Sequence, residues 1–199
     1  MCRLFETIRI ENGIPQHLLW HERRMERAIQ EFWPGSIPVK LAGLFHVPPE
    51  YSAGTVRCNV HYGPEITDII FKAYEKRMIR SLKLVICDTI DYHWKFKDRS
   101  QLDVLFAQRG TCDEILIVKN GLISDTSMSN TIFFDGLNRI TPATPLLRGT
   151  GRERLLEEGW LTEADIRPED LPKFSGCKLI NAMRYPGEEN MIPISEVSW

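Results

Sequence analysis

One run of eight residues constrains the fold more than any other feature of the chain. The sequence TVRCNVHY, at residues 55–62, alternates strictly between apolar and polar side chains, apart from the tyrosine at its end. Successive side chains of a β-strand point to opposite sides of the sheet, so this pattern predicts a strand with one apolar face and one polar face. Antiparallel sheets often bury one face and leave the other in water. The run therefore predicts an antiparallel sheet with one covered face.

Further strands and helices are predicted on both sides of this run, and no internal repeat is evident. Turns are indicated by Asn12-Gly13, Pro34-Gly35 and Asn120-Gly121, and Asn-Gly between two apolar runs is a strong hairpin signal. The other predicted elements, in order, are a strand at LFETIRI, a helix at HLLWHERRMERAIQEFW, strands at IIFKAY and SLKLVICDTI, a helix from Ser100 to Gln108, a helix at GTGRERLL, a short helix with the capping box TEAD (Thr162 to Asp165) and a last strand at KLINAM.

This order of elements predicts an α+β fold in two lobes. The spacing of the elements changes near Asp88 to Trp94, which makes this segment the best candidate for a boundary. We accordingly divide the chain into an N-terminal lobe of residues 1–90 and a C-terminal lobe of residues 91–199. A chain of 199 residues is long enough for two small domains that each bury a core.

Composition argues against several classes of protein. The 25 basic and 27 acidic residues nearly cancel, which argues against broad binding to nucleic acid or to a membrane surface. The five cysteines are scattered, and no spacing suggests a zinc site or another metal site. No signal peptide is visible, and no segment approaches the ~20 apolar residues that span a bilayer. Reduced cysteines then predict a cytoplasmic protein.

Two motifs can bind a phosphate or another anion. In GTGRERLL, glycines flank Thr150 just before a helix, and the first N–H groups of a helix attract anions. The alternative is an ordinary helix cap formed by Thr150. Arg24 lies at the border of the apolar stripe of the first predicted helix, where its planar guanidinium can reach a phosphate. The alternative is a surface arginine whose charge stays in water.

Two further motifs offer an amine and a carboxylate. Lys95 and Lys97 lie among aromatic residues, where a lysine can have a lowered pKa and act as a nucleophile or base. The alternative is a pair of solvated lysines, and the spacing does not choose between Lys95 and Lys97. Asp125 is surrounded by hydroxyl and amide residues that can fix the orientation of a carboxylate. Taken alone, this segment favours the alternative, a polar turn at the surface.

Taken together, these segments resemble the class IV aminotransferases, the fold-type IV enzymes that depend on pyridoxal 5'-phosphate (PLP). The resemblance covers most of the chain and follows the order of the family's motifs. These motifs are LFETIR at the start, H-x-x-R from His21 to Arg24, K-F-K-D-R from Lys95 to Arg99, G-L-I-S-D-T-S-M-S-N from Gly121 to Asn130 and G-T-G-R from Gly149 to Arg152. The resemblance implies a D-amino acid aminotransferase-like fold with a short N-terminal α/β lobe and a C-terminal β-barrel-like lobe. It also implies a homodimer.

The resemblance assigns roles to individual residues. Lys95, rather than Lys97, would bond to the aldehyde of PLP and would then move protons during catalysis. Arg24 and the backbone N–H groups of Thr150 and Gly151 would hold the phosphate of the cofactor.

The pyridine nitrogen of PLP would be kept protonated by Asp125, in a motif that ends at Asn130. The family usually has glutamate where this chain has Asp125. Relatives also usually have additional residues before the first strand. These two departures motivate one alternative, a non-catalytic relative that keeps the fold as a binding or regulatory module.

Within the family, the chain looks closest to 4-amino-4-deoxychorismate lyase, because N-A-M at Asn181 to Met183 is similar to the last strand of that branch. The implied reaction belongs to folate biosynthesis and releases pyruvate and 4-aminobenzoate. The alternative is an aminotransferase acting on a small amino acid, which would use the same residues. The candidates for binding the substrate carboxylate are Arg57 and His61, on the polar face of TVRCNVHY, and Arg9. The alternative for this face is that it simply meets water.

Overall fold

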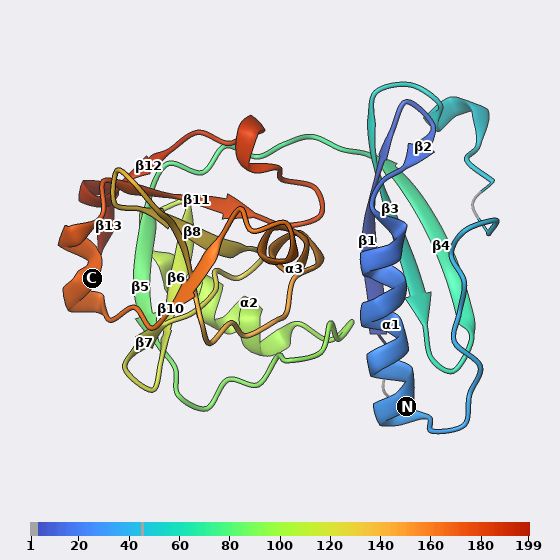
Figure 1. Ribbon diagram of the computed structural model, residues 1–199, viewed down its shortest axis with the longest axis horizontal. Coiled ribbons are helices and arrows are strands. Elements are labelled where there is room, and N and C mark those ends of the chain that lie inside the picture. The colour runs from blue at the N-terminus through green and yellow to red at the C-terminus, as the bar shows by residue number, and fades with distance from the viewer. Residues whose placement is uncertain (1–3, 45) are drawn as a thin grey trace. The chain divides into compact units, whose positions relative to one another are not determined.

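The computed structural model of the protein describes residues 4–44 and 46–199, so Cys2, one of the five cysteines, lies outside the described residues. The chain divides into two compact units. Unit 1 is the chain up to Lys76 together with Trp94–Asp98, and unit 2 is Arg77–His93 together with Arg99–Trp199. Both units combine strands with helices (Figure 1), which confirms the predicted α+β class.

Unit 1 is an antiparallel sheet of four strands with a helix packed on one face. The order of the strands is β2-β1-β3-β4, and the helix is α1. The elements of the unit are β1 (Leu4–Glu11), β2 (Ile14–Pro15), α1 (Leu18–Phe32), the 3-10 helix Pro49–Tyr51, β3 (Thr55–Tyr62) and β4 (Ile66–Ala73).

The alternation of β3 produces the covered face that the sequence predicted. Val56, Cys58 and Val60 are buried and belong to the same core cluster as Met25 and Ile29 of α1. The tight turn between β1 and β2 is also confirmed, because Asn12 and Gly13 both have positive φ, as a type I' turn requires.

The short segment Trp94–Asp98 joins unit 1 by pairing with the start of β1. The N–H of Phe5 donates to the carbonyl oxygen of Lys95 at 3.1 Å, and Leu4 forms a β-bridge with Phe96. Lys95 is therefore fixed beside the first strand by backbone contacts.

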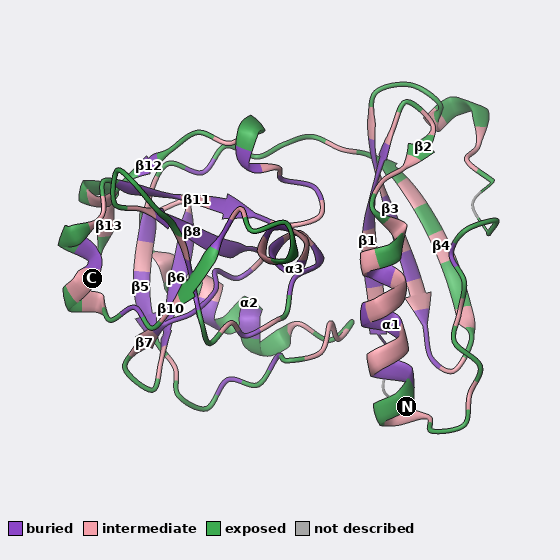
Figure 2. Ribbon diagram, viewed as in Figure 1, coloured by how far each residue is buried: buried purple, intermediate pink, exposed green. Residues whose placement is uncertain are grey.

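Unit 2 contains two sheets that share one hydrophobic core. Leu82 and Leu116 of one sheet pack in the same cluster as Phe133 and Cys177 of the other, and the central strands of both sheets are buried (Figure 2). The first sheet has the order β13-β5-β6-β7 and the second has the order β10-β9-β8-β11-β12. The result is a partly closed, barrel-like unit, as predicted.

The elements of unit 2 are β5 (Leu82–Ile86), α2 (Ser100–Phe106), the 3-10 helix Ala107–Arg109, β6 (Glu114–Lys119), β7 (Leu122–Ile123), β8 (Asn130–Phe134), β9 (Arg139–Pro142), α3 (Thr150–Glu157), β10 (Thr162–Ala164), the 3-10 helix Pro168–Lys173, β11 (Gly176–Ile180), the 3-10 helix Pro186–Glu188, β12 (Ile192–Pro193), the 3-10 helix Ile194–Glu196 and β13 (Val197–Ser198). The predicted hairpin at Asn120-Gly121 is confirmed by the pairing of β6 with β7.

The short helix predicted from TEAD is wrong. Thr162–Ala164 is the strand β10, which pairs in parallel with β9, with Thr162 opposite Ile140. The capping-box pattern is local, whereas the pairing with β9 is made by residues more than 20 positions earlier in the chain. The tertiary contact decides the conformation.

The division of the chain also differs from the predicted lobes of residues 1–90 and 91–199. The chain passes into unit 2 after Lys76, because β5 pairs in parallel with β6. It returns to unit 1 for Trp94–Asp98, because this segment pairs with β1.

No helix within residues 4–44 and 46–199 is both long enough and apolar enough to cross a membrane.

The packing of α1 on the sheet can be tested with neighbouring residues of that helix. Ile29 is 1% exposed and Gln30 is exposed. Ile29→Ala should lower the free energy of unfolding by about 2–5 kcal/mol, because it removes buried methyl groups and leaves a cavity. Gln30→Ala should change it by less than about 0.5 kcal/mol. Urea unfolding followed by circular dichroism measures both, and equal effects would contradict the packing described for α1.

Candidate functional site

Three buried polar residues lie between the sheet and the helix of unit 1. Glu6 of β1 is 0% exposed and accepts hydrogen bonds from Arg24 and His21 of α1. Arg24 Nε donates to Glu6 Oε1 at 2.9 Å and Arg24 Nη2 donates to Oε2 at 2.5 Å, while His21 Nδ1 lies 2.6 Å from Oε2. His21 and Arg24 are three residues apart on the helix, so they face the same carboxylate.

The charges of this cluster are set by burial and by the ion pair. Burial alone raises the pKa of Glu6, but the Arg24 guanidinium and the His21 hydrogen bond bring it down to about 2. Burial lowers the pKa of His21 from its usual value, against the opposing effect of Glu6. At neutral pH the cluster therefore holds an ionised Glu6, a neutral His21 and a permanently charged Arg24.

The position of Arg24 excludes one of the two alternatives for that residue, and phosphate binding stays a prediction. It is 5% exposed, so it is not a surface arginine with its charge in water. The bidentate hydrogen bonding of Arg24 to the two carboxylate oxygens of Glu6 fixes the orientation of the guanidinium plane. A guanidinium has five N–H donors, so the same side chain can bind Glu6 and also contact a second anion.

Lys95 and Lys97, which the spacing could not separate, have different surroundings. Lys95 is half-buried, and its Nζ lies 4.6 Å from the centre of the ring of Phe5. Its charge also contributes to the lowered pKa of His21. Lys97 is exposed. The two lysines therefore differ in burial, and Lys95 is packed against an aromatic ring of the first strand.

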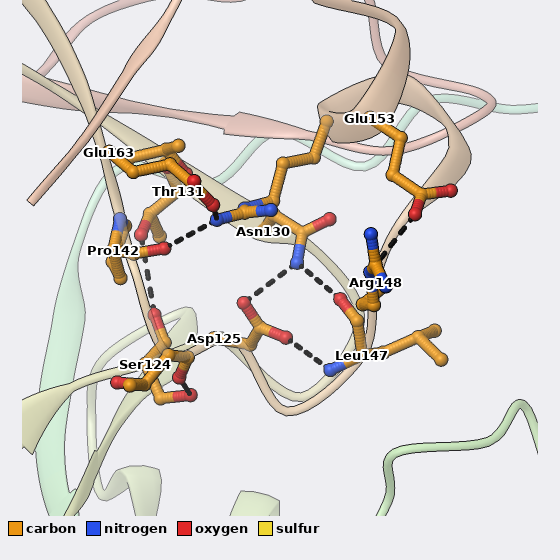
Figure 3. A network of polar contacts seen from close by, with 12 residues as sticks. Ser124, Asp125, Asn130, Thr131, Pro142, Leu147, Arg148, Glu153 and Glu163 are labelled. Atoms are coloured by element: carbon orange, nitrogen blue, oxygen red, sulfur yellow. Dashed lines mark hydrogen bonds and ion pairs between the residues drawn. The ribbon is translucent and has the colours of Figure 1, made fainter. Parts of the chain in front are cut away.

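In unit 2, Asp125 is buried in the segment between β7 and β8, at 5% exposure. Its Oδ1 accepts a hydrogen bond from Asn130 Nδ2 at 2.8 Å, and its Oδ2 accepts one from the N–H of Leu147 at 2.9 Å (Figure 3). Asn130 Nδ2 also donates to the carbonyl oxygen of Leu147 at 2.9 Å. The alternative of a surface turn is therefore wrong for Asp125, because the cost of burying its carboxylate is offset by these donors.

Burial raises the pKa of Asp125 to about 6, although the hydrogen bonds from Leu147 and Asn130 and the charge of Arg152 each act to lower it. A carboxylate has about four acceptor positions. The backbone N–H of Leu146 also acts to lower the pKa of Asp125, and these three protein donors leave its carboxylate able to accept a further hydrogen bond.

The start of α3 carries the G-T-G-R motif. Gly149 is the N-cap and no side chain caps the helix, so the alternative in which Thr150 forms the cap is wrong. Thr150 and Gly151 are the first two helical residues, whose N–H groups lack partners within the helix. A Cβ at position 149 would lie 2.0 Å from Oδ1 of Asn130. Glycine at this position lets the helix start pack against the amide that holds Asp125.

The three candidates for substrate binding share one face of the sheet in unit 1, opposite the face that packs on α1. Arg9 of β1 lies directly opposite Arg57 of β3, and Phe5 lies directly opposite His61, with the rings of Phe5 and His61 stacked at 6.0 Å between centres. Arg57 and His61 are half-buried, and Arg9 is 7% exposed. We call this side of the sheet the polar face.

The predicted site residues thus fall into groups, each within one unit. Unit 1 brings Arg24 to the Glu6–His21 cluster, places Lys95 over Phe5 and places the substrate candidates on the polar face. Unit 2 brings Asp125, Asn130, Thr150 and Gly151 together. Sequence reasoning assigned no role to Glu6 or His21. The signal for Glu6 was present: in LFETIRI it shares the alternating positions of Leu4, Ile8 and Ile10, which are all buried.

Comparison with known proteins supplies the family. The family model for amino-transferase class IV matches residues 3–197. The chain belongs to the class IV aminotransferase family. A protein from Haemophilus influenzae with no assigned function is 45% identical over 186 residues, which is 92% of this chain and 98% of that protein.

Class IV aminotransferases are PLP-dependent enzymes, and two solved structures are similar to this family member. One, from Haemophilus somnus 129PT, is provisionally named a 4-amino-4-deoxychorismate lyase; it is 36% identical, covers 92% of this chain and 97% of its own, and has a TM-score of 0.81. The other, from Mycobacterium tuberculosis, is described as a hypothetical aminotransferase in a PLP-bound form. It shows only the fold, at 14% identity and a TM-score of 0.74, over 98% of this chain and 81% of its own.

The residues of this family member fit PLP in charge and in donor type. Uncapped N–H groups at Thr150 and Gly151 and the buried cation Arg24 suit a phosphate. The buried carboxylate of Asp125 suits a protonated pyridine nitrogen, and the half-buried amine of Lys95 suits an aldehyde.

The ion pair in the buried cluster predicts a large effect of a small change. Glu6→Gln keeps the size of the side chain but leaves Arg24 buried without its counter-charge. The free energy of unfolding should fall by about 3–5 kcal/mol. Urea unfolding at pH 7 measures this, and Glu26→Gln, at a half-buried position of the same helix, is the control. Equal stability of Glu6→Gln and wild type would show that the pair contributes nothing.

The raised pKa of Asp125 predicts a pH dependence of opposite sign to that of an ordinary ion pair. The folded protein binds the proton of Asp125 more tightly than the unfolded chain does. The stabilisation that this proton gives to the folded protein is therefore fully present below about pH 4 and is lost as the pH rises through about 6. The stability of Asp125→Asn relative to wild type should therefore rise by on the order of 3 kcal/mol between pH 4 and pH 7. Asp103→Asn, at an exposed position, should keep a constant difference from wild type. A constant difference for Asp125→Asn as well would contradict the burial of an ionisable Asp125.

Proposed function

We propose that the protein is a PLP-dependent lyase of the 4-amino-4-deoxychorismate lyase type, which releases pyruvate and 4-aminobenzoate. The observation that carries the proposal is the half-buried amine of Lys95, placed over Phe5 and near the buried Glu6–His21–Arg24 cluster. Membership of the class IV family and the 36% identity to the provisionally named lyase of Haemophilus somnus support it.

The cofactor contacts follow from the chemistry of each group of residues. The resemblance assigns the phosphate to Arg24 of unit 1 and to the N–H groups of Thr150 and Gly151 of unit 2, and each group suits a phosphate by its own chemistry. Asp125, oriented by Asn130, would accept a hydrogen bond from the pyridine nitrogen and keep it protonated. Lys95 would hold the cofactor covalently. When bound, PLP supplies an electron sink that stabilises negative charge on the carbon next to the substrate nitrogen.

The residues of the chain then perform the proton transfers. With the cofactor bound, the amine of Lys95 would accept a proton from the substrate carbon and return it elsewhere. Its Nζ lies 4.6 Å from the centre of the Phe5 ring, which would hold the side chain of Lys95 in place beside the first strand. Neutral His21 nearby adds no positive charge that would oppose the return of the proton to Lys95.

The alternative function is that of a class IV aminotransferase acting on a small amino acid. The solved structure from Mycobacterium tuberculosis is described as an aminotransferase, and both reactions use the same cofactor contacts. The two functions differ in where the substrate carries its acid groups, so the substrate contacts on the polar face bear on the choice.

A non-catalytic relative is the third candidate. The predicted homodimer stays a prediction.

Incubation with aminodeoxychorismate tests the proposal. The protein loaded with PLP should release pyruvate and 4-aminobenzoate in equal amounts, measured by mass spectrometry. Lys95→Ala should lower the rate by more than about 1,000-fold, because both the covalent attachment and the proton transfer are lost. Lys97→Ala should stay within about threefold of wild type, because Lys97 is exposed.

Other products would decide against the lyase. Exchange of amino groups between amino acids and keto acids, without pyruvate from aminodeoxychorismate, would identify an aminotransferase. No turnover of either kind with PLP bound would identify a non-catalytic relative.

A further inference from the structure

Three cations lie side by side across the polar face of unit 1. Arg9 of β1 is directly opposite Arg57 of β3, and Arg57 is directly opposite Lys72 of β4. Side chains opposite each other on neighbouring strands have Cβ atoms about 5 Å apart, where like charges destabilise a sheet. We call these three residues the cation row.

The protein itself neutralises only part of this charge. Arg9 Nε lies 2.7 Å from Glu11 Oε2, in an ion pair on the same strand. Glu11, which lies opposite Thr55 and therefore diagonally across from Arg57, is the carboxylate that pairs with Arg9. Within residues 4–44 and 46–199, no ion pair of Arg57 or Lys72 with a carboxylate is found, and Asp68 of β4 lies further along, opposite His61. Three positive charges less one negative charge leave two, which is the charge that a dicarboxylate would balance.

A second observation on the same face also indicates a ligand. Asn59 lies between Arg57 and His61 on β3, and its Oδ1 is buried with no hydrogen-bond donor recorded in the described part of the chain. An acceptor that is buried without a donor costs free energy. Its neighbours across the strands are Thr7 and Ile70. An ionised carboxylate has no donor, so a different group of the ligand, such as an amine or hydroxyl, would satisfy this acceptor.

The cation row is also far from the proposed reacting amine. Lys95 Nζ lies over Phe5, and Arg9 is four residues further along β1. A strand rises about 3.4 Å per residue, so the row begins roughly 13 Å along the sheet from Phe5. Even with long side chains reaching back, the row is misplaced for the carboxylate of a simple α-amino acid, which is attached to the same carbon as the amine.

We infer that the polar face binds a dicarboxylate substrate whose acid groups lie at the end remote from its amine, with the cation row of Arg9, Arg57 and Lys72 as the specificity-determining contact. This inference rests on the proposed function for the position of the reacting amine. It adds Lys72 to the substrate contacts and excludes small monocarboxylic amino acids as the preferred substrates.

Binding of two aromatic acids tests the inference independently of turnover. Isophthalate carries two carboxylates and benzoate carries one, on the same ring. Isothermal titration calorimetry of the wild-type protein, with and without PLP, should give a Kd for isophthalate at least tenfold below that for benzoate. Arg57→Ala and Lys72→Ala should each reduce this ratio to threefold or less, because each leaves one net charge in the row.

Lys40→Ala provides the matched control, since Lys40 belongs to the same unit, is exposed and pairs with Glu22 away from the row. It should keep the wild-type ratio, and thermal unfolding of all variants verifies that they are folded. Arg57→Lys should retain most of the ratio, because the charge remains. An unchanged ratio in both Arg57→Ala and Lys72→Ala, or an equal loss in Lys40→Ala, would overturn the inference.

The same samples separate this inference from the proposed function. Uptake of PLP, followed by its absorbance, tests the proposed function and does not involve the cation row. A chain that takes up no PLP but binds isophthalate through Arg57 and Lys72 would refute the proposed lyase and still support the dicarboxylate site. A chain that takes up PLP but does not discriminate between the two acids would do the reverse.

Discussion

The pair formed by Glu6 and Arg24 is the interaction on which the arrangement of unit 1 depends. Two hydrogen bonds join the first strand of the chain to its first helix inside a core where neither charge meets water. Each partner requires the other, because an isolated buried charge would cost several kcal/mol. The pair therefore fixes how α1 lies on β1, and it places a cation of fixed orientation in the core. Lys95 is held to the same strand by backbone pairing, so the cation and the amine keep a constant relation.

Unit 2 also holds a buried ionisable side chain in a fixed orientation by hydrogen bonds, but here the side chain is a carboxylate. Asp125 is buried, and its orientation is set by Asn130 and by the backbone of Leu147 (Figure 3). Asn130 in turn packs against Gly149, where no larger residue fits, so the carboxylate and the uncapped start of α3 are positioned together. Hydrogen bonds from Asn130 and from the backbone of Leu146 and Leu147 do not bring the pKa of Asp125 back to its usual range. Such a carboxylate gains from a cationic neighbour, which a protonated pyridine nitrogen would provide.

Local patterns predicted those parts of the structure in which local and tertiary preferences agree. The alternation of β3, the helical spacing of α1 and the Asn-Gly hairpin turns each have a period or a backbone requirement that a single segment reveals. The TEAD segment failed, because its helix-capping pattern competes with a strand position beside β9 that only the folded chain offers. The boundary after residue 90 failed for a similar reason, since the partners of β5 and of Trp94–Asp98 lie far away in the sequence.

The candidate site was predictable as a set of residue types but not as an arrangement. Spacing could not separate Lys95 from Lys97, because burial of one and exposure of the other depend on pairing with β1. The sequence also favoured a surface turn at Asp125, because its polar neighbours are typical of such turns. In the structure these neighbours belong to a buried network. Glu6 gave a readable signal, a carboxylate at an apolar position of an alternating strand. Arg9 and Arg57 of the cation row were candidates from the sequence, but Lys72 was not, because only the register of three strands brings it beside them.

The central claim is that PLP is attached to the amine of Lys95, and peptide mapping tests it most directly. Treatment of the PLP-loaded protein with sodium borohydride fixes the cofactor to the lysine that holds it, and mass spectrometry of the peptides then identifies that lysine. The account predicts one modified residue, Lys95, in close to one copy per chain, and no modified residue in the Lys95→Ala variant. Modification at Lys97, spread over several surface lysines or absent altogether would contradict it.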